Sequence, residues 1–73
     1  MRRADICYHI HGHLSERDSA KLEHILRHHH GVQHAEHCNS KHTLNVAYDV
    51  DATNSVLLLS RIRMLDHQAS ILG

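Results

Sequence analysis

The sequence contains no phenylalanine, tryptophan or proline, and its eight basic and eight acidic residues leave no net formal charge. A nucleic-acid partner requires a basic face that neutralises phosphates, so this balance argues against one. No apolar run approaches the ~20 residues of a membrane-spanning helix, and no apolar core follows the basic start Met1-Arg2-Arg3. We therefore expect neither direct membrane insertion nor an export signal.

Cysteine is also scarce. Cys7 and Cys38 are the two cysteines, and they are far apart in the sequence. They could form one disulfide, but nothing else marks a secreted disulfide framework, so we expect two reduced thiols in a cytoplasmic protein. A chain of 73 residues is expected to form a single domain, 1–73, with a modest core.

Histidine is the residue type in excess, with eleven of 73 positions. Neutral imidazole is the commonest metal ligand among side chains, and it titrates near physiological pH. Binding that depends on neutral imidazole should therefore be lost on acidification. Most of the histidines are grouped, at His9, His11 and His13, at 28–30, and at His34 and His37.

The hydrophobic pattern predicts four strands, at residues 5–11, 32–38, 43–50 and 68–72. In the first, Ile6, Tyr8 and Ile10 alternate with residues of the opposite face, as expected of a half-buried strand. Residues 39–41 are a plausible hairpin turn between the second and third strands.

Two helices are predicted between these strands. Ser15 caps the first, with Asp18 three positions on, and Gly31 is a good stop. Asn54 or Ser55 begins the second, and Asp66-His67 breaks it. The apolar stripe of the second helix is expected at Val56, Leu58, Leu59, Ile62 and Leu65.

The resulting order is β-α-β-β-α-β, which predicts an α+β, ferredoxin-like sandwich. Its four-stranded antiparallel sheet would carry two helices on one face. The other face would be solvated or covered by a partner.

Several short segments follow the pattern of a known family. They are Ile10 two residues before Gly12, His30-Gly31-Val32, Val46-Ala47-Tyr48-Asp49 and Leu65-Asp66-His67-Gln68-Ala69. In these segments the chain resembles the heavy-metal-associated domain. That family includes small copper chaperones and the N-terminal metal-binding domains of heavy-metal P-type ATPases. The resemblance spans nearly the whole chain and implies this fold and a metal partner.

The chain departs from that family in the loop after the first strand. The family signature is Gly-Met-x-Cys-x-x-Cys, and the corresponding stretch here is Gly12-His13-Leu14-Ser15-Glu16-Arg17-Asp18. His13 stands at the methionine, and Ser15 and Asp18 stand at the two cysteines. The soft thiolate pair that would hold Cu(I) is therefore missing, and the family ligands are not carried over.

The topology suggests a different metal site. In this fold the first strand-helix loop, the hairpin and the connection before the last strand lie at one end. This brings His11 and His13 near Asp66 and His67, with His42 as a further neighbour. Imidazoles with a carboxylate suit Zn(II), Ni(II), Co(II) or Cu(II). The alternative is that these histidines only face solvent.

Two other groups are weaker candidates. His9 lies between Cys7 and His11 on the open face of the first strand, where the alternative is a solvated polar face. The third group comprises 28–30, His34, His37 and Cys38, for which we favour a solvated helix end that stabilises the helix dipole. Alignment with the family gives His37 a core-facing position, which suggests a bulge or an early strand end.

Two functions follow. The first is a non-enzymatic metal-delivery or sensing module that binds a borderline divalent ion (nickel, zinc, cobalt or copper) through His9, His11, His13, Asp66 and His67. Its partner would be a membrane metal transporter, or an ATPase domain downstream in the same chain. The alternative is a ferredoxin-like interaction or homo-oligomerisation module with pH-dependent histidines. No motif supports an enzyme.

Overall fold

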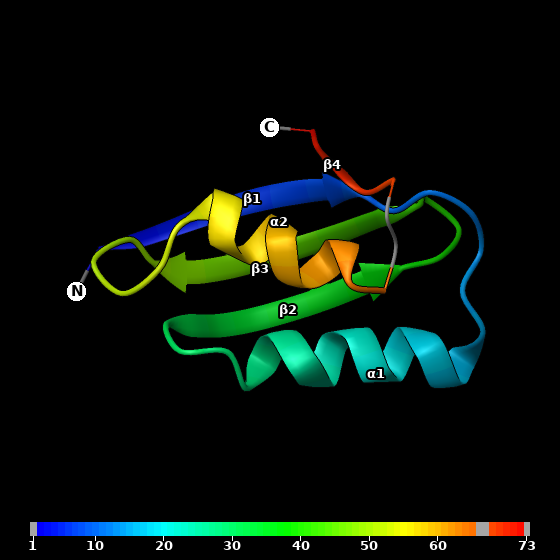
Figure 1. Ribbon diagram of the computed structural model, residues 1–73, viewed down its shortest axis with the longest axis horizontal. Coiled ribbons are helices and arrows are strands. Elements are labelled where there is room, and N and C mark those ends of the chain that lie inside the picture. Colours follow the sequence, from blue (N-terminus) through cyan, green and yellow to red (C-terminus); the bar gives the residue numbers. More distant parts are fainter. Residues whose placement is uncertain (1, 66–67, 73) are drawn as a thin grey trace.

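The computed structural model describes residues 2–65 and 68–72. It contains β1 (Arg3–His9), α1 (Glu16–Arg27), β2 (Val32–Cys38), β3 (Thr43–Asp49), α2 (Ser55–Arg63) and β4 (Ser70–Ile71). The four strands form one antiparallel sheet in the order β2-β3-β1-β4, and both helices cover the same face of it (Figure 1). The predicted ferredoxin-like α+β fold is confirmed.

The alternation of the strands separates a core face from an open face. Tyr8 is paired with Leu44 on the core side, whereas His9 is paired with Thr43 on the open side. The core side packs against apolar residues of both helices. The largest fully buried side chains are Tyr8, Ile10, Leu22, Leu26, Leu44, Val46, Leu58 and Ile62.

Tyr8 links the centre of the sheet to α2. Its hydroxyl donates a hydrogen bond to the carbonyl oxygen of Ser55 over 2.8 Å, so the one polar atom of this buried ring has a partner. Burial raises the pKa of Tyr8, with Tyr48 adding to the effect, so the phenol stays protonated at physiological pH.

The expected caps are present. The Ser15 hydroxyl accepts from the amide of Asp18 at 3.1 Å, and the Asn54 side chain accepts from the amide of Leu57 at 3.0 Å. Gly31 adopts φ +88°, and a Cβ there would lie 2.8 Å from Cβ of Ala52. Glycine is therefore required at this turn for both its conformation and its size.

Several predicted boundaries are wrong. β1 begins at Arg3 and ends at His9, two residues earlier than predicted at each end, and α1 ends at Arg27, before the trihistidine. The last strand is two residues long instead of five. The structure describes neither Asp66 nor His67, so the predicted break of the second helix there lies outside the described residues.

The predicted stripe of α2 is partly wrong. Leu58 and Ile62 are fully buried, but 68% of Val56 is exposed because it lies two residues from Leu58, on the opposite side of a helix. Leu65 follows the end of α2 and is exposed as well. Within 2–65 and 68–72, neither helix has the length and apolar character of a membrane span.

Candidate functional site

One end of the sheet gathers the loops that the sequence predicts to form a site. β1 ends there, the β2–β3 hairpin turns there, and α2 ends and β4 begins at the same end (Figure 1). We use the term loop end for the segment 10–15, between β1 and α1, together with the hairpin residues 39–42. Five histidines, in these two segments or close to them, determine the chemistry of this end: His9, His11, His13, His37 and His42.

His42 occupies an unusual backbone position. Its φ is +54°, in the left-handed region that non-glycine residues seldom adopt. Three hydrogen bonds hold it: its amide donates to Asn39 O at 3.2 Å, its carbonyl accepts from Ile10 N at 2.8 Å, and its Nδ1 lies 3.0 Å from Gly12 O. The hairpin and the loop after β1 together therefore fix the conformation of His42.

The contact with Gly12 also fixes which nitrogen of His42 carries the proton. A carbonyl oxygen only accepts hydrogen bonds, so Nδ1 must be the donor. In the neutral ring, Nε2 then keeps its lone pair. Metal-binding histidines commonly donate their other ring N–H to a backbone carbonyl in this way, which orients the ring and makes it more basic.

The ring of His9 adjoins those of His42 and His11. The ring centroids of His9 and His42 are 6.3 Å apart, and those of His9 and His11 are 6.4 Å apart. Among the described residues, no three His, Cys, Asp or Glu side chains are already arranged around a common metal position. Coordination at this end would therefore require the imidazoles to rotate toward one another.

His37 faces α1 from the core side of β2. Its Nδ1 lies 2.6 Å from the Ser19 hydroxyl, and its Nε2 is buried with no partner among the described groups. Burial is the main cause that lowers the pKa of His37. Glu23 opposes this effect, and positive charge on His13 and His42 adds to it. His13, His37 and His42 are therefore electrostatically coupled.

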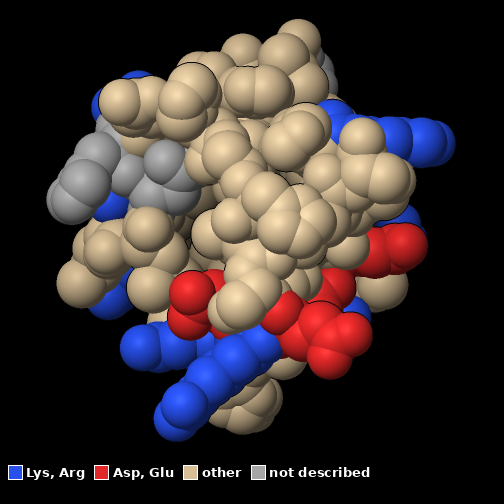
Figure 2. Space-filling view, turned by 90° about the vertical axis from the view of Figure 1, so that its right-hand side faces the viewer, with Lys and Arg blue, Asp and Glu red and all other residues tan. Residues whose placement is uncertain are grey.

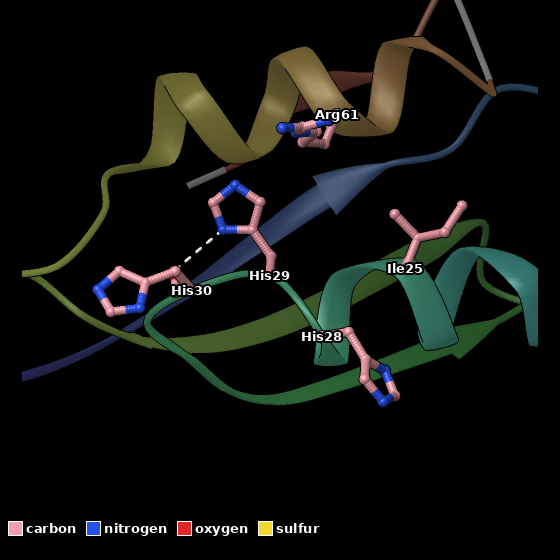
Figure 3. A pocket seen from close by; sticks show the side chains of 5 residues that line it. All are labelled: Ile25, His28, His29, His30 and Arg61. Carbon is pink, nitrogen blue, oxygen red and sulfur yellow. Dashed lines mark hydrogen bonds between the residues drawn. The ribbon is translucent and has the colours of Figure 1, made fainter.

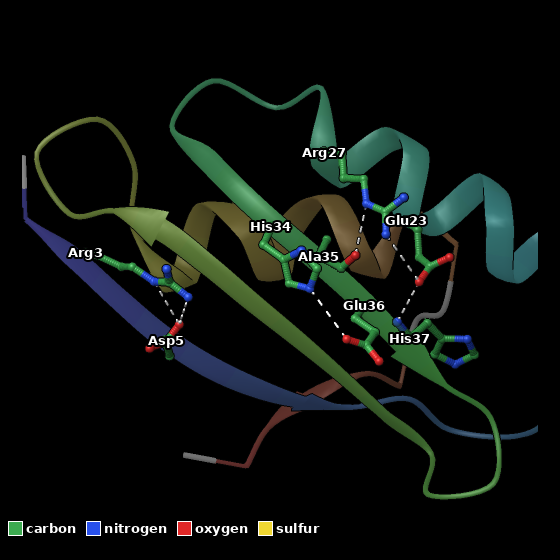
Figure 4. A network of polar contacts seen from close by, with 8 residues as sticks. All are labelled: Arg3, Asp5, Glu23, Arg27, His34, Ala35, Glu36 and His37. Carbon is green, nitrogen blue, oxygen red and sulfur yellow. Dashed lines mark hydrogen bonds and ion pairs between the residues drawn. The ribbon is translucent and has the colours of Figure 1, made fainter.

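Ser19, His37 and Glu23 do not form a catalytic triad. The carboxylate of Glu23 accepts from the backbone amide of His37 at 2.9 Å, not from its ring (Figure 4). The serine contacts Nδ1, so no carboxylate orients the imidazole as a general base for it. The prediction that His37 disturbs the strand is wrong, because it pairs regularly with Leu44 and the register shift lies between Val32 and His34.

Asn39 fastens the hairpin to the loop after β1. Its side-chain oxygen accepts from the Leu14 amide at 3.0 Å, and its side-chain nitrogen donates to the Leu14 carbonyl at 2.6 Å. Leu14 itself packs against the hydrophobic core. This double hydrogen bond keeps the loop that carries His13 next to the hairpin that carries His42.

Charged side chains surround the loop end more than they fill it. Figure 2 views this side of the molecule and shows Lys, Arg, Asp and Glu over its lower part and at both sides, with other residues over the centre and the top. Fixed charges of Lys, Arg, Asp and Glu are therefore sparse at the centre of this side.

The predicted ligands divide into two groups. The structure brings His9 and His11 together and places His13 at the same end. Asp66 and His67 lie outside the described residues, so their part in the site stays a prediction. His42, predicted only as a further neighbour, lies with its ring beside that of His9. The register of the hairpin could have predicted this position, since the pairing of His9 with Thr43 puts residue 42 beside the end of β1.

The third predicted group is dispersed. His28, His29 and His30 all border an open hollow of about 360 Å³, together with Ile25 and Arg61, but the ring of His28 points away from those of His29 and His30 (Figure 3). His34 lies 3.5 Å from the Glu36 carboxylate on an exposed part of β2 (Figure 4).

The two cysteines do not meet. Cys7 and Cys38 are free thiols on different rungs of the sheet, opposite Asn45 and Thr43 respectively. The hydrogen bond with the Ser40 side chain is the main cause that lowers the pKa of Cys38, which lies at the start of the hairpin.

The sequence matches no protein-family model and no curated protein. The structure resembles a copper-binding domain of HMA7, a P-type ATPase, with a TM-score of 0.87 and 21% identity over 99% of this chain and 96% of that one. Oxidised MerP from Ralstonia metallidurans has a TM-score of 0.87 and 11% identity, over 99% of this chain and 100% of MerP. A copper CopA variant from Bacillus subtilis has a TM-score of 0.73 and 23% identity, over 96% of this chain and 90% of the CopA chain.

A further MerP structure, in its mercury-bound form, is that of a periplasmic protein, so this fold is also found outside the cytoplasm. At these low identities the likeness establishes the fold and leaves the chemistry to the residues of this chain. The chain has the ferredoxin-like α+β fold of heavy-metal-associated domains.

Proposed function

We propose that this chain reversibly binds a borderline divalent transition-metal ion through neutral imidazoles at the loop end. His9 and His42 are the first ligands, and His11 and His13 are the neighbours that complete or exchange the coordination. The observation that carries the proposal is the hydrogen bond from His42 Nδ1 to Gly12 O, which leaves Nε2 available beside His9. Asp66 and His67 remain predicted contributors.

The proposed mechanism is ligand exchange. An open site with two imidazoles and solvent binds an ion less tightly than a closed structural site does, because coordination positions remain accessible. An incoming ligand from a partner can then take the ion without prior unfolding. Delivery to, or sensing for, a metal-transporting P-type ATPase fits this chemistry, and the cytoplasmic location belongs to the same proposal.

The choice of ions follows from the ligand type. Imidazole nitrogen suits Zn(II), Ni(II), Co(II) and Cu(II), whereas Cu(I) prefers thiolates, and neither cysteine lies within the loop end. Protons compete with metal for neutral imidazole, so the affinity should fall as the pH is lowered.

The test compares two matched double variants of the metal-free protein. His9→Gln/His42→Asn removes the proposed ligands and keeps a residue that tolerates the left-handed conformation at position 42. His29→Gln/His30→Asn makes the same chemical changes elsewhere. Calorimetric titration with Zn(II) at neutral pH should show about tenfold weaker binding at one site in the first variant. Equal affinity in the two variants would reject the assignment.

An interaction module remains the second candidate, because apolar side chains are exposed on α2 and near β4. They are Val56, Leu57, Met64, Leu65, Ile71 and Leu72. Such residues mark a protein contact when they form one patch. Sedimentation from pH 5.5 to 8 in chelator tests it, since a change of mass without metal supports this function and a change only with metal supports the first.

A further inference from the structure

α1 carries a second pair of imidazoles at its C-terminal end, remote from the loop end. His24 and His28 are four residues apart, so they lie one above the other on the same side of the helix. Their ring centroids are 4.2 Å apart with an interplanar angle of 40°, closer than the loop-end ring pairs. Both residues are exposed.

His28 has its protons arranged as a metal ligand requires. Its Nδ1 lies 2.9 Å from the carbonyl oxygen of His24, so Nδ1 donates and Nε2 keeps the lone pair in the neutral ring. The same carbonyl also accepts from the backbone amide of His28 at 3.2 Å, and the hydrogen bond from the ring orients the imidazole. Figure 3 shows that this ring points away from His29 and His30.

The electrostatic setting also favours a cation. His24 lies in the last turn of α1 and His28 is its C-cap, at the end where the helix dipole places partial negative charge. The neighbouring cation, Arg27, is directed elsewhere: its guanidinium donates to Ala35 O at 3.1 Å and lies 3.9 Å from the Glu23 carboxylate (Figure 4). Lys21 lies one turn before His24 on the same side of the helix and is the charge that would oppose binding.

We infer that His24 and His28 form a second metal site that binds one borderline divalent ion between their ring nitrogens. Two imidazoles four residues apart on one helix face are the spacing used by zinc-binding helices. With nitrogen ligands, Cu(II) should bind more tightly than Ni(II), Co(II) or Zn(II), and water would fill the remaining positions. This inference concerns different residues from the proposed function and does not depend on it.

The test uses a protein whose loop-end site has been removed. In the His9→Gln/His42→Asn background, Cu(II) titration followed by calorimetry should still show one binding event. Substoichiometric Cu(II) should broaden the imidazole NMR signals of His24 and His28 before those of His29 and His30. If no binding event remains in this background, or if His29 and His30 broaden first, the inference is wrong.

Matched variants distinguish binding by the pair His24 and His28 from nonspecific binding by any exposed histidine. Adding His24→Gln to that background should weaken Cu(II) binding by about tenfold or more, whereas adding His30→Gln should leave it within about twofold. Glutamine is a good helix former, so helix content measured by circular dichroism should be unchanged. Equal weakening by the two substitutions would show that any displayed histidine contributes, and this would overturn the inference.

A gain-of-function variant gives an independent check. Lys21→Glu removes the opposing charge and places a carboxylate one turn from His24, on the side of α1 that carries the pair. Cu(II) binding in the same background should become several-fold tighter. Unchanged or weaker binding would contradict an ion held on this side of α1. The wild-type affinity at the loop end is measured separately, so failure here leaves the proposed function standing.

Discussion

His42 donates a hydrogen bond from Nδ1 to the carbonyl oxygen of Gly12 over 3.0 Å, and this contact joins the β2–β3 hairpin to the loop after β1. The hydrogen bond holds a residue with left-handed backbone and leaves the other ring nitrogen available. The side chain of His42 thus contributes both to the stability of the fold and to the proposed metal binding, and substitutions at this position can separate the two effects.

Substitutions of His42 should change stability and metal affinity to different extents. His42→Ala loses the hydrogen bond and places alanine in the left-handed region, which costs about 1–2 kcal/mol. His42→Asn tolerates that conformation, so its unfolding free energy should stay closer to wild type. Both variants should bind Zn(II) more weakly. Urea unfolding and calorimetry check this, and full Zn(II) affinity in either variant would contradict the role of His42.

Asn39 should matter for the site although it is no ligand. Asn39→Ala removes two hydrogen bonds to Leu14 and leaves a part-buried amide and carbonyl without partners, at a cost of roughly 1–3 kcal/mol. The loop that carries His13 should then become more mobile and Zn(II) binding weaker. Amide hydrogen exchange at residues 12–15 measures the mobility. Ser40→Ala, at the exposed tip of the same hairpin, is the control and should leave that exchange unchanged.

The two left-handed glycines should differ in their tolerance of alanine. At Gly12 an added Cβ meets nothing within 4 Å, so Gly12→Ala should cost only the conformational strain of about 1–2 kcal/mol. At Gly31 the Cβ would also lie 2.8 Å from Cβ of Ala52 and 3.1 Å from Cγ2 of Thr53, which adds about 1–3 kcal/mol of overpacking. The midpoint of thermal unfolding should be lower for Gly31→Ala than for Gly12→Ala. The reverse order would contradict the close contact of residue 31 with Ala52.

Acid should destabilise the fold partly through His37. Burial lowers the pKa of this imidazole from its ordinary 6.5, so the unfolded chain takes up the proton more readily than the folded protein does. This contribution to stability is complete above about pH 6.5 and is lost as the pH falls through the lowered pKa. Glu23 opposes the shift, whereas charge on His13 and His42 strengthens it.

His37→Leu removes this titrating group, so the unfolding free energy should depend less on pH below about 6.5 than in wild type. The measurement is urea unfolding across that range, in chelator so that metal does not contribute. His34→Leu is the control, because His34 is exposed beside Glu36 and this variant therefore replaces a surface histidine. A pH dependence unchanged in His37→Leu would refute the role of His37.

The period of the apolar residues was sufficient to predict the fold, but not the details of the site. Alternation around Tyr8 identified the core face of β1, and the caps at Ser15 and Asn54 located the starts of both helices. Val56 was misplaced because a count of apolar residues does not respect the helical angle. The tautomer of His42 depends on a carbonyl thirty residues away, so no local pattern could reveal it.

The proximity of His24 and His28, unlike the tautomer of His42, follows from a local spacing in the sequence. Their spacing is visible in the sequence, yet the run 28–30 draws attention away from His24, whose ring adjoins that of His28. Only the helix end at Arg27 assigns His28 to His24 rather than to its two neighbours. Element boundaries, more than element types, therefore decided which histidines can share an ion.

The most direct test of the account is the response of individual imidazoles to Zn(II). Side-chain nitrogen NMR of the metal-free protein at pH 7.5, before and after one equivalent of Zn(II), resolves Nδ1 and Nε2 of each histidine. We predict that Nε2 of His42 and a ring nitrogen of His9 shift markedly, whereas His29 and His30 stay unchanged. Unchanged resonances of His9 and His42 under saturating Zn(II) would contradict the proposed site.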